Sequence, residues 1–571
     1  MRISAGTKLG AGLVLLFLSF WTLFFRLGSL PLSGADEPRY ARIAQEMQQQ
    51  GRWITPTLEG KPWLEKPPLY YWITIPIYAV LGHSETTARL GTAAFALLTV
   101  LAVFWMAARL WSPLAGFLSA VILLTSFGFA GYGRSASMDM LLTACLTVAL
   151  SVLAVAAARR DLASWKLWPA YVSLGLAILA KGPVALALAA GIAILFWCFD
   201  ERGGSLRLWH PVSGLIIAAA VSLPWYWLAF RQNGFSFISI FFINHNVARF
   251  VSDIHHHSQP FYYYVPVLLG MLFPWSGWLP VLVRDSPMEV LRRWKNWSPP
   301  TLFLICWIVF PLVFFSFSVS KLAGYILPVL PPLAVLLGAR FAALWESSAL
   351  TAGGWASWLF LGLTAALAVA APVAFDRAFD GNWKAGLWIA CAAIVPGTVA
   401  FLFGRRGWWK HAFIATGAQA VMVVITVVVA AYPALGDHYS TRDVANTALR
   451  VREPGESIAT YRFFNHTLHY YTGYQVTEEF QDSASLKRFI AGHHRVLVVT
   501  EAGSIPELER TKDLEITTLF SQSNFRLIRI QSPMPTGSVR TSDLGFRTLD
   551  LVVETLKFRF PTGNLPQEQN A

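Results

Sequence analysis

The chain has 571 residues, of which 55% are hydrophobic and only 13% are charged. A soluble globular domain is nearer 25% charged, so this composition excludes a soluble protein over most of the length. The formal net charge of +13 is explained better by basic residues in the cytoplasmic loops of a membrane protein than by a nucleic-acid partner, which we do not expect.

Apolar runs of about 18–22 residues recur along the chain and predict membrane spans. We predict about thirteen spans, the first centred near residue 18 and the last near residue 421. No small-residue cleavage site follows the first run, which therefore predicts a retained span. Lys181, Gly182 and Pro183 separate two short runs and predict a helix break. The four cysteines all lie in apolar runs without a CxxC pair, which argues against disulfides and thiolate metal sites.

The distribution of basic residues predicts the orientation. With the N-terminus in the cytoplasm, most short cytoplasmic loops carry basic clusters, as the positive-inside rule requires. The first loop, residues 30–88, then lies outside although it carries basic residues, and long loops are only weakly bound by the rule. An odd number of spans places the C-terminus outside as well.

The first outer loop contains two predicted surface segments. In "DEPRYARIAQEM" the residues Tyr40, Ile43, Ala44 and Met47 share one helix face, which predicts an amphipathic helix along the membrane surface. The stretch "KPPLYYWITIPIYAV" predicts a second interfacial or re-entrant segment that prolines interrupt. Two such segments could wall a cavity on the outer face.

From residue 433 the apolar runs shorten to strand length. The runs are "ESIATYRF", "HRVLVVT", "NFRLIRI" and "LDLVVE", with polar, helix-compatible stretches between them. We therefore predict a transmembrane domain over residues 1–432 and a small α/β domain over residues 433–571.

Polar residues gather at the outer edges of the predicted spans. Ionisable groups at membrane depth are costly and tend to mark a site, so their position on six separate connections predicts one shared outer-face cavity. These residues are Asp36, Glu37, Arg39, Tyr40, Glu65, Lys66, Arg134, Asp139, Lys181, His245, Arg249, His255–His257, Lys321 and Tyr325.

Structural alternatives exist for several of these residues. Asp36, Glu37 and Asp139 are candidate helix caps, with Pro38 suited to a first helical position. Lys66 and Arg249 are candidates for contacts with lipid head groups, and the histidine triplet suits a solvated loop.

The chemistry of this group favours a lipid-phosphate substrate. Arginine presents a fork to phosphate oxygens and lysine supplies a point charge, beside carboxylates that can position an acceptor. The chain has no Walker A loop and no dinucleotide fingerprint, so we expect no nucleotide. An activated group would then arrive on a lipid.

The first-loop stretch "DEPRYARIAQEM…GRWITPTLEGKPWLEKPPLYYW" resembles the first external loop of bacterial lipid A aminoarabinose transferases. These enzymes lie within the protein O-mannosyltransferase-like group, which has the GT-C fold. Weaker blocks follow in the family's order over roughly residues 10–345: "GRSASMDM", "AKGP", "NHNVARF…HHHSQPFYYY" and "SKLAGYILPVLPPLA". The resemblance implies a GT-C membrane enzyme of the bacterial inner membrane whose active site and C-terminal domain face the periplasm.

The resemblance also implies a reaction. It is an inverting transfer of a sugar, with 4-amino-4-deoxy-L-arabinose as the leading candidate, from undecaprenyl phosphate to the phosphate of lipid A. A protein hydroxyl or another glycan stays open as acceptor. A lipid or small-molecule transporter is the alternative class, which would need polar residues near the bilayer midplane and two related halves. We expect a monomer.

Roles for individual residues follow from the resemblance. Asp36 would be the main catalytic carboxylate, which orients or deprotonates the acceptor, and Asp139 would be a second essential carboxylate. The residues implied to bind the donor lipid phosphate are Arg39, Tyr40, Lys66, Lys181, Arg249 and Tyr325.

A divalent metal is a further expectation. Glu65 with His245, or with a histidine of the 255–257 triplet, could bind zinc through carboxylate and imidazole. The spacing is not a recognised ligand motif. Asn244 stands where the family often carries an acidic residue, which weakens the case for a metal.

Overall fold

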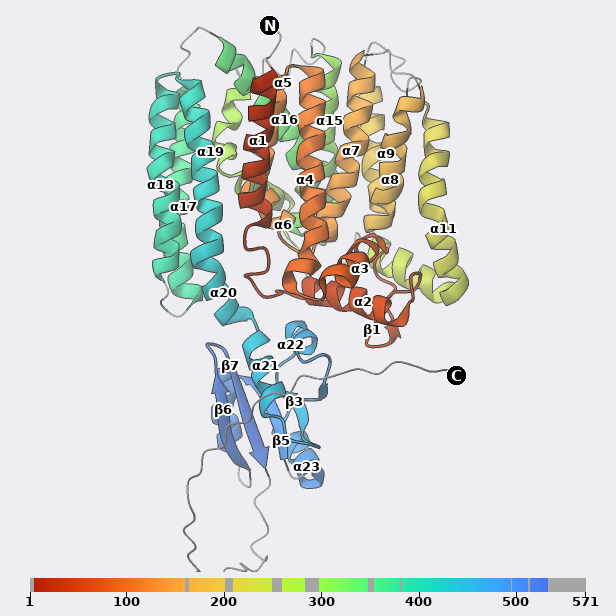
Figure 1. Ribbon diagram of the computed structural model, residues 1–571, viewed down its shortest axis with the longest axis vertical. Helices are drawn as coiled ribbons and strands as arrows, with labels where there is room; N and C mark the ends of the chain where they lie inside the picture. Colours follow the sequence, from red (N-terminus) through yellow and green to blue (C-terminus); the bar gives the residue numbers. More distant parts are fainter. Residues whose placement is uncertain are drawn as a thin grey trace, which may run out of the picture.

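The computed structural model describes residues 5–159, 164–200, 209–248, 259–282, 297–347, 354–379, 381, 383–493, 495–511 and 514–531. Long helices stand side by side in a bundle, and a smaller unit with a β-sheet lies beyond one end of it (Figure 1). Short helices of the first loop lie between the bundle and this unit. The chain is thus a polytopic helical membrane protein with a C-terminal sheet domain.

Among the described residues, eight helices are long and apolar enough to cross a membrane, and the count reaches ten if two bent pairs are each one span. The predicted number of about thirteen is therefore not confirmed. Three shorter helices, α1 (Ala5–Ser19), α8 (Trp168–Lys181) and α9 (Pro183–Phe199), stand in the same bundle (Figure 1). The long helices are α4 (Glu85–Leu110), α7 (Met138–Arg159), α11 (Pro211–Phe237, continued by η3, Ile238–Ala248), α15 (Pro299–Phe317), α16 (Leu330–Glu346, preceded by η7, Ala323–Val329), α17 (Gly354–Ala378), α18 (Trp383–Arg405) and α19 (Trp409–Thr426, continued by η8, Val427–Ala431).

One bent pair joins α5 (Pro113–Leu124) to α6 (Phe127–Gly133) at 69°, and the other joins η4 and α13 (Phe261–Leu272) to η5 (Trp275–Leu282) at 108°. At the first bend the hydroxyls of Thr125 and Ser126 donate to carbonyls four residues earlier, at 2.6 Å each. Such bonds to the preceding turn bend helices.

The predicted break between α8 and α9 is confirmed. Gly182 has φ 82° and ψ −153°, outside the helical region, and Pro183 begins the next helix. The break leaves Lys181 as the last residue of α8.

The first loop forms α2 (Asp36–Gln50) and α3 (Leu69–Leu81), which lie at the end of the bundle that faces the sheet domain (Figure 1). The predicted apolar face of α2 is present, but it is buried by protein rather than spread on lipid: Tyr40 is 5% exposed, and Ile43, Ala44 and Met47 are fully buried with tyrosines of α3. Pro76 lies inside α3 and does not interrupt it. Between these helices Glu46 accepts hydrogen bonds from Thr57 and from backbone N–H groups of the hairpin of β1 (Thr57–Leu58) and β2 (Lys61–Pro62).

Asp36 and Glu37 both lie in the first turn of α2, but neither is its N-cap residue, so the cap interpretation is wrong. Helix α2 begins at Asp36 itself, its N-cap residue is Ala35, and the cap makes no side-chain hydrogen bond. Pro38 is therefore the third helical residue. Asp139 is likewise the second residue of α7, where its backbone N–H is capped by the hydroxyl of Ser137 at 3.2 Å.

The C-terminal domain contains a five-stranded mixed sheet in the order β4-β3-β5-β7-β6. The strands are β3 (Ser457–Tyr461), β4 (Val476–Phe480), β5 (Arg495–Glu501), β6 (Glu515–Ser521) and β7 (Phe525–Gln531). Three of the four predicted runs form β3, β5 and β7, and the fourth, residues 549–554, lies outside the described residues. Strands β3, β4 and β5 run parallel, whereas β7 pairs antiparallel with β5 and β6.

Helices cover both faces of this sheet. Ile458, Leu497 and Val499 pack on one side with α21 (Arg442–Val451) and α22 (His466–Tyr471). Their neighbours in the strands pack on the other side with α23 (Ser483–His493) and α24 (Ile505–Glu509). Helix α20 (Tyr432–Tyr439) leads from the bundle into the domain, and the boundary after residue 432 stays a prediction.

Candidate active site

A cavity of about 830 Å³ lies where α2, the start of α7, the end of α8 and η7 meet. Its size is typical of a small-molecule or cofactor site. Nine of the ten predicted site residues line it, and the tenth, Arg249, lies outside the described residues. The nine are Asp36, Arg39, Tyr40, Glu65, Lys66, Asp139, Lys181, His245 and Tyr325.

Asp36 and Arg39 form an ion pair at the start of α2. Nη2 of Arg39 donates to Oδ1 of Asp36 at 2.6 Å, and its Nε donates to the carbonyl of Ala35 at 2.9 Å. The side chain of Asp36 is 61% exposed, so its second carboxylate oxygen is open to a ligand. The Arg39 guanidinium also lies 5.2 Å from the ring centre of Trp63, which fixes its plane.

Asp139 and Lys181 form a second pair across the cavity. The ammonium group of Lys181 donates to Oδ1 of Asp139 and lies 4.6 Å from the ring centre of Tyr325. The side chains of the pair are about one-fifth exposed, at 22% and 18%. This ammonium group is therefore held by a carboxylate and an aromatic face while it still borders the cavity.

Tyr40 closes the cavity on the side of α3. Its ring centre lies 5.8 Å from that of Tyr70 and 6.4 Å from that of Tyr71. Burial, with a further contribution from the Asp36 charge, raises the pKa of Tyr40 well above its ordinary range. Tyr40 therefore offers a neutral hydroxyl and no phenolate.

Glu65 and His245 meet at the cavity wall, with Oε1 of the glutamate 3.5 Å from Nε2 of the histidine. Zinc usually takes three or four protein ligands. Within the described ranges, no group of three or more His, Cys, Asp or Glu residues could hold a metal ion, and the histidine triplet at 255–257 lies outside them. The two described side chains therefore lie close together but do not by themselves complete a zinc site.

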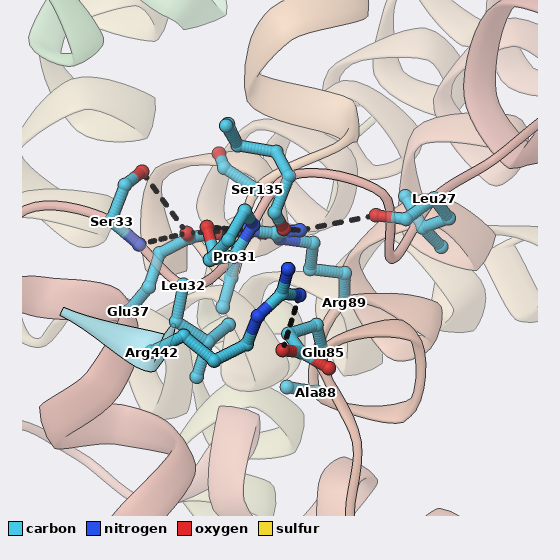
Figure 2. Close-up of polar contacts among 12 residues, drawn as sticks. Leu27, Pro31, Leu32, Ser33, Glu37, Glu85, Ala88, Arg89, Ser135 and Arg442 are labelled. Carbon is cyan, nitrogen blue, oxygen red and sulfur yellow. Dashed lines mark hydrogen bonds and ion pairs between the residues drawn. The ribbon is translucent and has the colours of Figure 1, made fainter. Parts of the chain in front are cut away.

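Glu37, which lines the cavity, forms a buried ion pair with Arg89, and sequence reasoning missed this pair (Figure 2). Oε1 of Glu37 accepts from Nε of Arg89 at 2.9 Å and from the backbone N–H of Ala136 at 2.7 Å. Oε2 accepts from Nη2 of Arg89 at 2.6 Å and from the backbone N–H of Ser33 at 3.0 Å. The remaining donors of Arg89 bind carbonyls of the segment that precedes α2: Leu27, Leu30 and Pro31.

This pair ties three parts of the site together: the segment before Asp36, the start of α4, and the segment before Asp139. The side chains of Arg89 and Glu37 are only 2% and 9% exposed. Burial alone would raise the pKa of Glu37, but the Arg89 charge and these hydrogen bonds hold that pKa below its ordinary value. The sequence did contain one signal for this pair: Arg89 is a charged residue at the outer start of a predicted span.

The C-terminal domain contacts the same region. The hydroxyl of Tyr471 accepts from the backbone N–H of Leu32 at 2.8 Å and donates to Glu85 at 3.1 Å. Arg442 approaches the same carboxylate, at 3.5 Å (Figure 2). These contacts hold the sheet domain against the segment that leads into Asp36.

Known structures share this fold. Crystal structures of ArnT from Cupriavidus metallidurans, bound to undecaprenyl phosphate and in the apo state, match with TM-scores of 0.75 and 0.74 at 22% and 23% identity. Each match covers 92% of this chain and 98% of the other. Residues 11–246 also match the family model described as dolichyl-phosphate-mannose-protein mannosyltransferase. The chain therefore has the GT-C fold, as predicted.

Curated relatives confirm the resemblance predicted from the first loop. The chain is similar to proteins named undecaprenyl phosphate-alpha-4-amino-4-deoxy-L-arabinose arabinosyl transferase. The one from Pectobacterium atrosepticum is 35% identical over 327 residues, which cover 56% of this chain and 57% of the relative. The corresponding "transferase 2" of Proteus mirabilis is 31% identical over 377 residues, 65% of this chain and 66% of the relative. The matched part of the chain thus spans less than two thirds of the length of each of these relatives.

Proposed function

We propose that this protein transfers 4-amino-4-deoxy-L-arabinose from undecaprenyl phosphate to a phosphate of lipid A. One observation carries the proposal: a single cavity at one end of the helix bundle combines the carboxylates of Asp36 and Asp139, among others, with cationic side chains from separate elements. That combination suits an anionic lipid donor and a second, acceptor substrate. The similarity to the named arabinosyl transferases supports the sugar and the carrier.

In the proposed reaction, Arg39 and Lys66 bind the phosphate of the carrier. The bond between C1 of the sugar and the phosphate oxygen breaks, and the bonding electrons stay on that oxygen. Nearby positive charge stabilises the leaving phosphate as this charge develops. Lys181, held by Asp139 and Tyr325, adds a fixed cation to the same wall. Arg249 is predicted to join this group.

The acceptor oxygen forms the new bond to C1 from the opposite face, which inverts the anomeric carbon. An acceptor phosphate is already ionised near neutral pH, so Asp36 then acts by position and charge. With a hydroxyl acceptor, Asp36 would take the proton as general base. Its exposed carboxylate suits either role.

The proposal includes the orientation in the membrane. We place the cavity and the C-terminal domain on the periplasmic side of the inner membrane, with the N-terminus in the cytoplasm. The positive-inside pattern supports this orientation. The transporter alternative is less favoured because the charged residues line a cavity next to the first loop, at one end of the bundle.

Lipid A mass spectrometry in a Gram-negative host that lacks its own transferase and is sensitive to polymyxin tests the function. We expect the protein to add the mass of aminoarabinose to lipid A and to raise polymyxin resistance. Sugar on a protein or on another glycan, with lipid A unchanged, would favour the alternative acceptors. No sugar transfer to any acceptor would favour the transporter class.

Gly324 offers a test of the site geometry. A Cβ added there would lie 2.7 Å from Oδ2 of Asp139 and 2.9 Å from Tyr132, closer than real contacts allow. Gly324→Ala should displace Asp139 and lower transfer by about 10- to 100-fold, because small misplacements of reacting groups are costly. Gly362→Ala, where the added Cβ meets nothing within 4 Å, is the matched control. Equal initial rates for the two variants would contradict the placement of Asp139.

Zinc at Glu65 and His245 stays a prediction, and no step of the proposed reaction passes through it. The prediction requires about one zinc ion per purified chain. The Glu65→Gln variant should lose this ion, because a carboxylate oxygen is a zinc ligand and an amide is a poor substitute. Elemental analysis of the wild-type protein and of Glu65→Gln measures the zinc content. Metal-free protein with full transfer activity would contradict the prediction.

A further inference from the structure

A second cavity of about 510 Å³ adjoins the first on the side of the C-terminal domain. Ser33, Gly34 and Ala35 line both cavities, so they meet at the backbone immediately before Asp36. The rest of its lining comes from the first loop, from α20, and from the start of α22 with the two residues before it. These residues are Leu30, Leu435, Tyr439, Phe464, Asn465, His466 and Thr467.

The two cavities differ in chemistry. The first contains arginine, lysine and carboxylate side chains, whereas no Lys, Arg, Asp or Glu occurs among the described residues that line the second. Two aromatic side chains of the second cavity stay half exposed, Phe464 at 52% and Tyr439 at 53%. An aromatic face carries negative charge density and attracts positively polarised C–H groups, such as those on the flat face of a sugar ring.

Polar groups complete the lining without adding charge. Burial lowers the pKa of His466 to about 4, and the charges of Arg39 and His469 contribute in the same direction. His466 is therefore neutral at pH 7 and offers one N–H donor and one nitrogen acceptor. With the hydroxyl of Ser33, it can bind sugar hydroxyl or amide groups, whereas a phosphate would favour the cations of the first cavity.

The walls of the second cavity are held in place. The hydroxyl of Tyr471 accepts from the N–H of Leu32, which fixes the sheet domain against the first loop beside Ser33. At the shared rim Gly34 has φ +65°, and an added Cβ would meet nothing within 4 Å. The rim is therefore built from small residues with open space beside them.

We propose that the second cavity binds the sugar backbone of the acceptor, so that the acceptor's phosphate extends past Gly34 to Asp36. This inference rests on the proposed function and adds to it the place of the acceptor's hexosamine ring. Phe464 and Tyr439 supply the stacking faces, and Ser33 and His466 supply hydrogen bonds. The donor phosphate stays with Arg39, Lys66 and Lys181 in the first cavity.

Binding measurements on the purified full-length protein test this proposal. Lipid A and undecaprenyl phosphate are titrated separately into wild type, Phe464→Ala and Tyr439→Ala. We expect each variant to bind lipid A about 10-fold more weakly, which corresponds to about 1.4 kcal/mol, and to bind undecaprenyl phosphate as wild type does. Phe464→Tyr, which keeps the ring, should retain wild-type affinity. Phe235→Ala removes an exposed phenylalanine of α11 and is the control.

A water-soluble phosphorylated glucosamine disaccharide, without acyl chains, serves as competitor. Displacement of lipid A by this disaccharide from wild type, but more weakly from Phe464→Ala, supports binding of the sugar ring. Unchanged lipid A affinity in both alanine variants, equal loss of both lipids, or failure of the disaccharide to compete would overturn the proposal. Wild type that binds lipid A as described but transfers no aminoarabinose would refute the proposed function and leave the sugar-binding cavity standing.

Discussion

Glu37→Gln should destabilise the protein by about 3–5 kcal/mol, the usual effect of removing one partner of a buried ion pair. The substitution keeps the size of the side chain but leaves the Arg89 charge buried without its counter-charge, since Arg89 is only 2% exposed. Thermal unfolding of the detergent-purified protein, followed by intrinsic fluorescence, measures the loss. The segment before Asp36 should loosen as well, because Ser33 and Ala136 lose part of their hydrogen bonding.

Glu85→Gln is the matched control for Glu37→Gln. Glu85 faces Arg442 at 3.5 Å, and their side chains are 20% and 35% exposed, so the loss should stay below about 1 kcal/mol. Because the folded-state pKa of Glu37 lies below its ordinary value of 4.5, the pair stabilises fully above that pH. The stabilisation is lost as pH falls through the lowered pKa. The melting temperatures of wild type and Glu37→Gln should therefore differ most at pH 7 and converge in acid; equal values at pH 7 would contradict the role of the pair.

Asp36→Asn should reduce transfer by about 100-fold or more while the protein stays folded, because general-base or positioning groups contribute on this scale. The side chain is 61% exposed, and its bond to Arg39 lies at the protein surface, so little stability is at stake. Initial rates with saturating donor measure the effect. A folded Asp36→Asn variant with wild-type rates would contradict the proposed role of Asp36.

The acceptor type decides what Asp36→Asn removes. With an ionised phosphate acceptor no base is required, so the substitution removes only the positioning and the charge of the carboxylate, whereas with a hydroxyl acceptor it also removes the general base. Asp443→Asn is the matched control, since Asp443 is half exposed in the C-terminal domain and pairs only at 3.5 Å with Arg442. It should leave the rate unchanged.

Hydrophobic patterning predicted the helical membrane domain and three strands, because apolar runs and their breaks are local signals. Two edge strands escaped it: β4 and β6 consist mostly of half-buried and exposed residues rather than of an apolar run. The number of spans was less predictable. A bend such as that at Thr125 and Ser126 depends on hydroxyl bonds to the preceding turn and on packing, which hydropathy does not register.

More of the candidate site than of the surrounding fold could be predicted, since charged residues near a membrane edge stand out in the sequence. Nine predicted residues line one cavity. Arg89 stood out as a charge at the start of a predicted span, but its pairing with Glu37 could not be read from the sequence, because the two residues lie 52 positions apart and only folding brings them together. Phe464 and His466 gave no signal either, since aromatic and histidine residues of a small domain are ordinary until the domain docks beside Ser33.

The central claim is best tested with the purified protein, a defined undecaprenyl phosphate-aminoarabinose donor, and lipid A in parallel with a hydroxyl-bearing peptide. Product masses are read after equal times for wild type and Asp36→Asn. We expect wild type to form aminoarabinose-modified lipid A with release of undecaprenyl phosphate, and Asp36→Asn to form almost none. Donor left intact by wild type, or sugar found on the peptide and absent from lipid A, would contradict the account.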